Sequence, residues 1–136
     1  MPVDFRCALA APGNILVADG ALGTYLQAQG LPPGTPPELW NLEQPDVVRS
    51  LHRAYLAAGA QILTTNTFGG NRLRLGDEVQ GHRLEDLVRR GVELAREVAG
   101  GAAWVAGDMG PTGRLLEPYG DLTCDRAEEA YAEQAR

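Results

Sequence analysis

The stretch QILTTNTFGGN, Gln61–Asn71, begins as an apolar run and ends in polar residues and two glycines. Ile62 and Leu63 are typical of a buried β-strand, whereas an asparagine between two threonines is poor material for one. In parallel α/β folds, the carboxyl ends of the strands open onto the ligand site. The pattern therefore predicts a strand that is apolar in the core and polar where it reaches a pocket.

Two further runs end in the same way. ILVAD (Ile15–Asp19) leads into a glycine, and AWVAGD (Ala103–Asp108) carries a glycine and an aspartate at its end. Together with QILTT (Gln61–Thr65), they are apolar runs that do not alternate with polar residues. Such runs are typical of parallel strands that are covered on both faces.

The segments between these strands show helical periodicity. Apolar residues recur at helical spacing after Pro45 until Gly59, and again over residues 82–99 before Gly100. Strand and helix thus alternate, which predicts an α/β fold built from βαβ units. We also expect a short helix within Ala21–Gly30, a proline-rich, non-helical connector over Leu31–Asn41 and a last helix capped by Asp125.

The chain has 136 residues, a formal net charge of −6 and 44% hydrophobic residues. This length suits one domain, and an acidic balance without a basic patch argues against nucleic acid or an anionic membrane as partner. No apolar run is long enough to span a bilayer, and the opening residues lack the apolar core of a secretion signal. We therefore place the protein in the cytoplasm, where Cys7 and Cys124 are expected to be free thiols.

Polar groups at the strand ends are candidate ligand-binding residues. The Asp19 carboxylate can hold an ammonium group, while Gly20 and Ala21 offer backbone amides to a carboxylate. Asp108 is able to orient a substrate, and Gly110 follows it in a rigid glycine–proline sequence. The same residues also suit ordinary turns, and the neighbouring threonines suit a strand. Residue types alone predict a pocket for a small zwitterionic or polar ligand and leave the reaction open.

Other motifs are weak. His52 and His82 lie in or beside charged helical patterns and are expected on solvated faces, with no cysteine or carboxylate at metal-ligand spacing. The sequence contains no GxGxxG, P-loop or Gly-x-Ser-x-Gly motif, so a dinucleotide site and a serine-hydrolase site are disfavoured.

Three motifs, in this order and spacing, resemble the homocysteine S-methyltransferase family. They are ADGALGTYLQAQGL (18–31), ELWNLEQPDVVRSLHRAYLAAGAQILTTNTFGGNRLRL (38–75) and VAGDMGPTGRLLEPYG (105–120). The resemblance is nearest to the homocysteine-binding module of the cobalamin-dependent methionine synthases. It implies a TIM (βα)8 barrel, of which residues 1–136 form the N-terminal part, about three βα units. The rest of this homocysteine-binding domain is expected beyond residue 136.

The resemblance also assigns residues to the pocket. Asp19 and Gly20 match the Asp-Gly pair that meets the amino-acid end of homocysteine, and Thr65 and Phe68 match positions that line the same pocket. Gly110 matches a glycine–proline loop after the third strand. Ala21, Asn66 and Asp108 are added from the ends of the apolar runs, so the predicted substrate-binding residues are Asp19, Gly20, Ala21, Thr65, Asn66, Phe68, Asp108 and Gly110.

The resemblance implies zinc, which in this family is bound by three cysteines on later strands and converts the homocysteine thiol into a thiolate. Cys7 and Cys124 match none of these positions, so the zinc ligands are expected beyond residue 136. No catalytic or metal-binding residue is predicted within the chain. Cobalamin is a candidate methyl carrier, and the methylcobalamin–methyltetrahydrofolate branch is the favoured methyl donor.

The leading hypothesis is that the complete protein is a cytoplasmic zinc-dependent methyltransferase that makes methionine from L-homocysteine. The chain itself, expected to be inactive alone, supplies part of the amino-acid pocket. Three parallel strands leave unpaired edges, which favours a larger protein over a small domain or a dimer. Two other functions stay open: a non-catalytic module that binds a small amino acid or completes a barrel, and a barrel methyltransferase for another thiol or a selenol.

Overall fold

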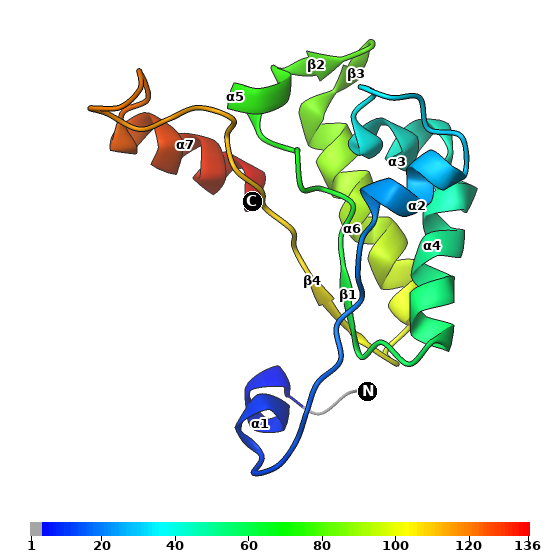
Figure 1. The fold of residues 1–136 in the computed structure, drawn as a ribbon. Helices are drawn as coiled ribbons and strands as arrows, with labels where there is room; N and C mark the ends of the chain where they lie inside the picture. The colour runs from blue at the N-terminus through cyan, green and yellow to red at the C-terminus, as the bar shows by residue number, and fades with distance from the viewer. Residues whose placement is uncertain (1–3) are drawn as a thin grey trace.

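The structure is a computed structural model that describes residues 4–136 (Figure 1). In chain order its elements are α1 (Phe5–Ala10), α2 (Gly23–Ala28), the 3-10 helix η1 (Pro37–Leu39), α3 (Trp40–Glu43), α4 (Pro45–Ala57), β1 (Ile62–Thr64), α5 (Arg72–Leu75), β2 (Glu78–Val79), β3 (His82–Arg83), α6 (Leu84–Ala99), β4 (Trp104–Ala106) and α7 (Cys124–Gln134). The helices surround a parallel sheet of β1 and β4, and β2 and β3 form a separate antiparallel pair, so the predicted α/β class is confirmed.

The sheet is built around β1. β1 and β4 pair in parallel, with Ile62 opposite Trp104 and Thr64 opposite Ala106. On the other side of β1, Ala18 forms an isolated parallel bridge with Ile62, and the Asp19 N–H donates to the Ile62 carbonyl at 2.9 Å. The carboxyl ends of all three segments therefore lie at one edge of the sheet.

The predicted strand Ile15–Asp19 is wrong, because only Ala18 within it takes part in a bridge. Ile15 and Val17 are 81% and 52% exposed, so this run is not covered on both faces as its composition predicted. Among residues 4–136, the segment pairs with β1 at Ala18 alone, whereas β4 pairs with β1 at three positions.

The two long helices end where predicted, but α6 begins at Leu84 instead of residue 82, because His82 and Arg83 form β3. α4 begins at Pro45, whose missing N–H is tolerated in the first turn, and is followed by Gly59 with φ +100°. α6 ends before Gly100, which adopts the left-handed conformation that favours glycine at a helix end. The short helix predicted within Ala21–Gly30 is also confirmed, as α2.

Two predictions about the shorter segments are wrong. The connector Leu31–Asn41 is not free of helix, because η1 starts at Pro37 and α3 follows it directly. Proline is compatible with the first turn of a helix, so the prolines lie before and at the start of this one instead of preventing it. The N-cap of α7 is Thr123, whose hydroxyl accepts from the Arg126 N–H, and Asp125 lies in the first turn.

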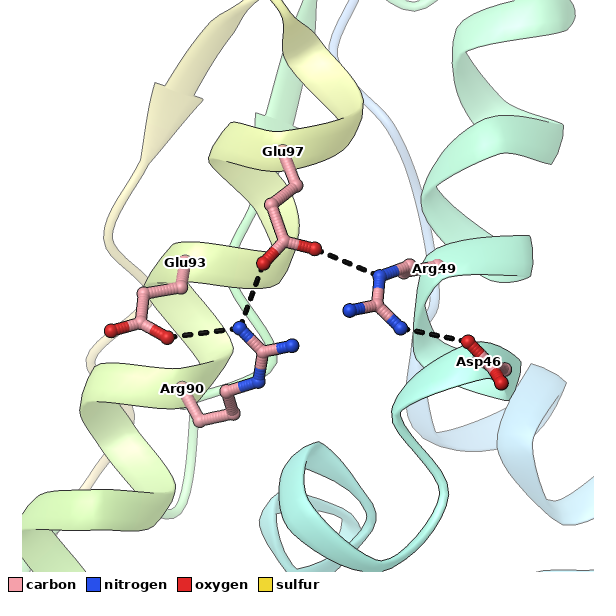
Figure 2. A network of polar contacts seen from close by, with 5 residues as sticks. All are labelled: Asp46, Arg49, Arg90, Glu93 and Glu97. Carbon is pink, nitrogen blue, oxygen red and sulfur yellow. Dashed lines mark hydrogen bonds and ion pairs between the residues drawn. The ribbon is translucent and has the colours of Figure 1, made fainter.

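Helices α4 and α6 lie side by side and pack against β1 (Figure 1). Their exposed edges are joined by an ion-pair network, in which Arg49 contacts Asp46 and Glu97 while Arg90 contacts Glu93 and Glu97 (Figure 2). Apolar residues from α4, α6, β1 and the shorter segments packed against them form three buried clusters. They are Leu26, Leu31, Val48 and Leu94; Ala60, Leu63, Ala99 and Ala103; and Leu39, Val79 and Leu87.

His52 is not on a solvated face, so that prediction is wrong. Its side chain is 0% exposed, because it follows Val48 and Leu51 on the buried face of α4. Neither ring nitrogen has a hydrogen-bond partner within residues 4–136, and burial lowers the pKa of the imidazole. His82 is half-buried, with Nε2 3.3 Å from Glu43 Oε1.

Cys7 and Cys124 are both exposed free thiols, as predicted. Over the described residues 4–136, no helix combines the length and the apolar composition needed to cross a membrane.

Gly91 lets α6 approach the segment that follows β1. A Cβ atom at this position would lie 2.7 Å from Asn41 Nδ2, 2.8 Å from Thr67 Cγ2 and 3.1 Å from the Asn66 carbonyl. Asn41 cannot easily give way, because its amide donates to the carbonyls of Asn66 and Leu87. The close contact between this helix and the polar loop therefore requires glycine.

We expect Gly91→Ala to lower the free energy of unfolding by about 1–3 kcal/mol, the usual cost of forcing a methyl group into a packed interior. Urea unfolding of the complete protein measures this. Gly107→Ala is the matched control, since a Cβ there meets no atom within 4 Å. Equal stability of the two variants would contradict the packing described for Gly91.

Candidate functional site

A half-open pocket of about 610 Å³ lies at the carboxyl ends of β1 and β4. One wall is the backbone of residues 20–23, which follows Asp19, and a second wall is the segment 34–38 that leads into η1. The remaining lining residues are Gln27, Thr64, Asn66, Phe68, Gly69, Arg74, Leu75 and Asp108. The structure thus brings together loops that follow three parallel segments, as the repeated strand endings predicted.

The polar residues after Leu63 alternate between two directions. Thr64, Asn66 and Phe68 line the pocket, whereas Thr65 and Thr67 are buried and are not among its lining residues. Thr64 is the last residue of β1, and beyond it the chain turns: Asn66 lies at a bend, and the Thr67 N–H donates to the Thr65 carbonyl at 2.9 Å. The run after Ile62-Leu63 is therefore polar for two reasons. Thr64 and Asn66 line the pocket, and Thr65 and Thr67 lie in the interior.

Thr65 and Thr67 connect the two strand ends. The Asp108 N–H donates to the Thr65 hydroxyl at 3.0 Å, and the Thr67 hydroxyl donates to the Asp108 carbonyl at 2.7 Å. The two hydroxyl oxygens lie 2.6 Å apart. Because each hydroxyl carries one proton, Thr65 donates to Thr67 and the three residues form a closed ring of hydrogen bonds. The Thr65 hydroxyl therefore both donates and accepts within the protein.

Asp19 is held by Thr64. The Thr64 N–H and hydroxyl donate to the two carboxylate oxygens of Asp19 at 2.8 and 2.9 Å. A carboxylate can accept about four hydrogen bonds, so the half-buried Asp19 retains acceptor capacity. The loop after it is fixed by the Tyr55 hydroxyl, which donates to the Ala21 carbonyl at 2.8 Å.

Asn66 ties the same segment to the α3 region. Its amide donates to the Pro37 carbonyl at 2.9 Å and to Asn41 Oδ1 at 2.8 Å, and its own carbonyl accepts from Asn41 Nδ2 at 2.8 Å. Both asparagine side chains are buried. This pairing holds the second wall of the pocket against the end of β1.

Gly110 lies behind Phe68 and is not among the lining residues. Its N–H donates to the Phe68 carbonyl at 2.9 Å, and a Cβ on Gly110 would lie 2.7 Å from the Phe68 ring. Helix α7 supports this loop, since the Tyr131 hydroxyl donates to the Gly110 carbonyl at 3.1 Å. The glycine therefore allows the close packing that fixes the Phe68 backbone.

Glu38 is a pocket residue that the sequence analysis missed. It is only 2% exposed, and its Oε1 accepts from the Gly69 N–H at 2.5 Å. Burial raises the pKa of this carboxyl, while hydrogen bonds from its own N–H and from Gly69 act in the opposite direction. The sequence signal for this position is ELWN directly after two prolines, a pattern that indicates the start of a helix.

Carboxylates dominate the charge of this site. Burial raises the pKa of Asp108, and the negative charge of Asp19 adds to the rise. Asp108 in turn acts on Glu38 in the same direction. A ligand that brings a positive charge near these three carboxylates would relieve their mutual repulsion, so the arrangement suits an ammonium group.

Of the eight predicted substrate-binding residues, Gly20, Ala21, Asn66, Phe68 and Asp108 line the pocket. Asp19 lies directly behind Thr64, and Thr65 and Gly110 support the pocket from behind. In the part of the chain that the structure describes, no three His, Cys, Asp or Glu side chains are placed so that they could hold a metal ion.

Glu38→Gln tests the electrostatics of the buried carboxyl. A raised pKa in the folded state means that Glu38 favours folding below its ordinary value of 4.5 and that this contribution is lost as pH rises through the raised pKa. Glutamine retains an oxygen for the Gly69 N–H and does not titrate. The variant should therefore unfold at the same or a higher temperature than the wild type at pH 8, with the advantage disappearing toward pH 4.

Thermal unfolding of the complete protein across this pH range measures the effect, with Glu128→Gln as the exposed control. A variant that is less stable by the same amount at every pH would show that Glu38 is not a destabilising charge at neutral pH.

Comparison with known proteins supports one family. The sequence profile described as "Homocysteine S-methyltransferase" matches residues 16–136. Two similar relatives are the methionine synthases of Mycobacterium tuberculosis, 38% identical, and Mycobacterium leprae, 37% identical, each over 90% of this chain. The chain spans 11% of the length of these curated relatives.

The structure is similar to the homocysteine methyltransferase MmuM from Escherichia coli. Its metallated form matches with a TM-score of 0.63 and 31% identity, over 78% of this chain and 41% of that chain. The oxidized form matches with a TM-score of 0.64 and 30% identity, over 79% of this chain and 41% of that chain. Both the sequence and the fold therefore show that the chain belongs to the homocysteine S-methyltransferase family.

Proposed function

We propose that this chain is the amino-acid-binding part of a methyltransferase that transfers a methyl group to L-homocysteine and so makes methionine. Family membership and the relatives named methionine synthase support this activity. The pocket supports the substrate, since it combines carboxylates with the open backbone of Gly20 and Ala21. These are the two kinds of group that an α-amino acid requires.

The observation that carries the proposal is the position of Asp19 beside the pocket. Thr64 donates to both carboxylate oxygens of Asp19. Burial raises the pKa of Asp108, and the nearby negative charge of Asp19 raises it further. A substrate ammonium group that binds here gives up its bound water and contacts carboxylates that are already held in position. Binding therefore requires no side chain to be reordered. In this proposal, the chain binds and orients the amino-acid end of homocysteine.

We further propose that residues 1–136 form the first βα units of a TIM (βα)8 barrel and part of its homocysteine-binding domain. The parallel order of Ala18, β1 and β4, with α6 between β1 and β4 in sequence, fits such a barrel. The similarity to MmuM over 41% of that chain supports the same arrangement.

Zinc and cobalamin remain proposals for the complete protein. Residues 4–136 do not fit a zinc site, because no suitable group of ligands is present there and Cys7 and Cys124 are exposed on α1 and α7. We place the zinc ligands beyond residue 136 and expect this chain alone to be inactive. Methylcobalamin with methyltetrahydrofolate stays the favoured source of the methyl group, and a cytoplasmic location stays a prediction.

Asp19→Asn in the complete, zinc-loaded protein tests the proposal. Asparagine keeps one acceptor oxygen for Thr64 but removes the charge, so the dissociation constant for L-homocysteine should rise about tenfold or more, as expected for loss of a charge-assisted hydrogen bond. Isothermal titration calorimetry measures this, and thermal unfolding checks that the fold is retained.

Asp125→Asn is the matched control, because Asp125 is exposed on α7 and is not among the residues that line the pocket. If homocysteine binds the Asp19 and Asp125 variants equally well, Asp19 does not hold the ammonium group.

A further inference from the structure

The pocket is lined by a positively charged residue, Arg74, that the sequence analysis did not assign to it. Its charged lining residues, among those described, are the carboxylates Glu38 and Asp108 and the guanidinium of Arg74. Burial raises the pKa of Glu38, and the positive charge of Arg74 acts against that rise. Positive and negative charge therefore face the same cavity.

Arg74 belongs to the short helix α5, where it lies two residues after Arg72. Residues two apart point to opposite sides of a helix, and the two arginines have different surroundings. Arg72 forms ion pairs with Glu133 at 2.6 Å and Asp77 at 3.3 Å. Arg74 forms no salt bridge with any of residues 4–136, and its guanidinium carbon lies 5.7 Å from the centroid of the Phe68 ring.

The position of Arg74 is prepared by its neighbours. Asn71 is buried and caps α5, since its side chain accepts from the Leu73 N–H at 2.9 Å. The Phe68 ring below the guanidinium is packed against Gly110. A guanidinium stacked on an aromatic face keeps its N–H groups available at its edge for a planar anion. Arg74 thus combines an aromatic support with available donors at the pocket wall.

We infer that Arg74 binds the α-carboxylate of the amino-acid substrate. This inference rests on the proposed function and adds to it a residue that distinguishes an amino acid from a simple amine. An α-amino acid carries its ammonium and carboxylate on one carbon atom, so the site must present opposite charges close together. Asp19, Asp108 and Glu38 provide the negative side, and Arg74 provides the positive side together with the amides of Gly20 and Ala21.

The test compares two ligands on the complete, zinc-loaded protein by calorimetry: L-homocysteine, and aminopropanethiol, which is homocysteine without its carboxylate. Arg74→Met should weaken L-homocysteine binding about 10- to 100-fold, the range for a charged hydrogen bond, and change aminopropanethiol binding less than about threefold. Arg74→Lys should recover most of the lost affinity, since it restores the charge.

Arg72→Met is the matched control and should leave the affinity for both ligands unchanged, because Arg72 is paired with Glu133 outside the pocket. Equal L-homocysteine affinity in the wild type and Arg74→Met would overturn the inference and leave the carboxylate to the backbone amides. Equal weakening of both ligands would also overturn it, since Arg74 would then act on the pocket as a whole. Failure of the wild-type protein to bind L-homocysteine would instead contradict the proposed function itself.

Discussion

The pocket depends on a closed ring of hydrogen bonds where β1 leaves the sheet. The last backbone bond between the strands joins the Thr65 N–H to the Ala106 carbonyl at 2.9 Å. Beyond it, the hydroxyls of Thr65 and Thr67 bind the N–H and carbonyl of Asp108. Buried backbone groups must be paired, so these hydroxyls allow two strands to separate into loops without exposing unsatisfied groups in the interior. They fix the distance between the loops that carry Asn66 and Asp108.

Three kinds of constraint extend from this ring. Asn66 and Asn41 hold the segment before α4, the Glu38 carboxylate holds the Gly69 amide, and Gly91 allows α6 to pack closely against Thr67. The first two constraints each involve a buried polar group with a specific partner, and such groups favour one arrangement because the alternatives leave them unpaired. These contacts hold in place the segments around the pocket, which is lined by both negatively and positively charged side chains.

Much of the fold could be predicted from local pattern. Pro45 and Gly100 mark helix ends by their own backbone preferences, and the apolar periodicity of α4 and α6 shows their buried faces. What the pattern could not show depends on contacts far apart in sequence. His52 is buried because the sheet and α6 cover its face of α4, and Thr65 faces inward because Asp108 lies behind it. The segment 15–19 looks like a strand locally, but it pairs with β1 at Ala18 alone, and its own composition does not show this. Glu38 was not predicted to line the pocket because a charged residue beside prolines usually lies in solvent.

Amide hydrogen exchange of the complete protein tests the central claim most directly, namely that the carboxyl ends of these parallel segments bind homocysteine. Exchange of peptides covering residues 19–23 and 64–71 should slow when L-homocysteine is added, because the ligand stabilises the folded loops that it contacts. The peptide covering α1, which lies away from these loops at the opposite end of the sheet (Figure 1), should be unaffected. Unchanged exchange over 19–23 and 64–71, at a concentration where calorimetry shows binding, would contradict the account.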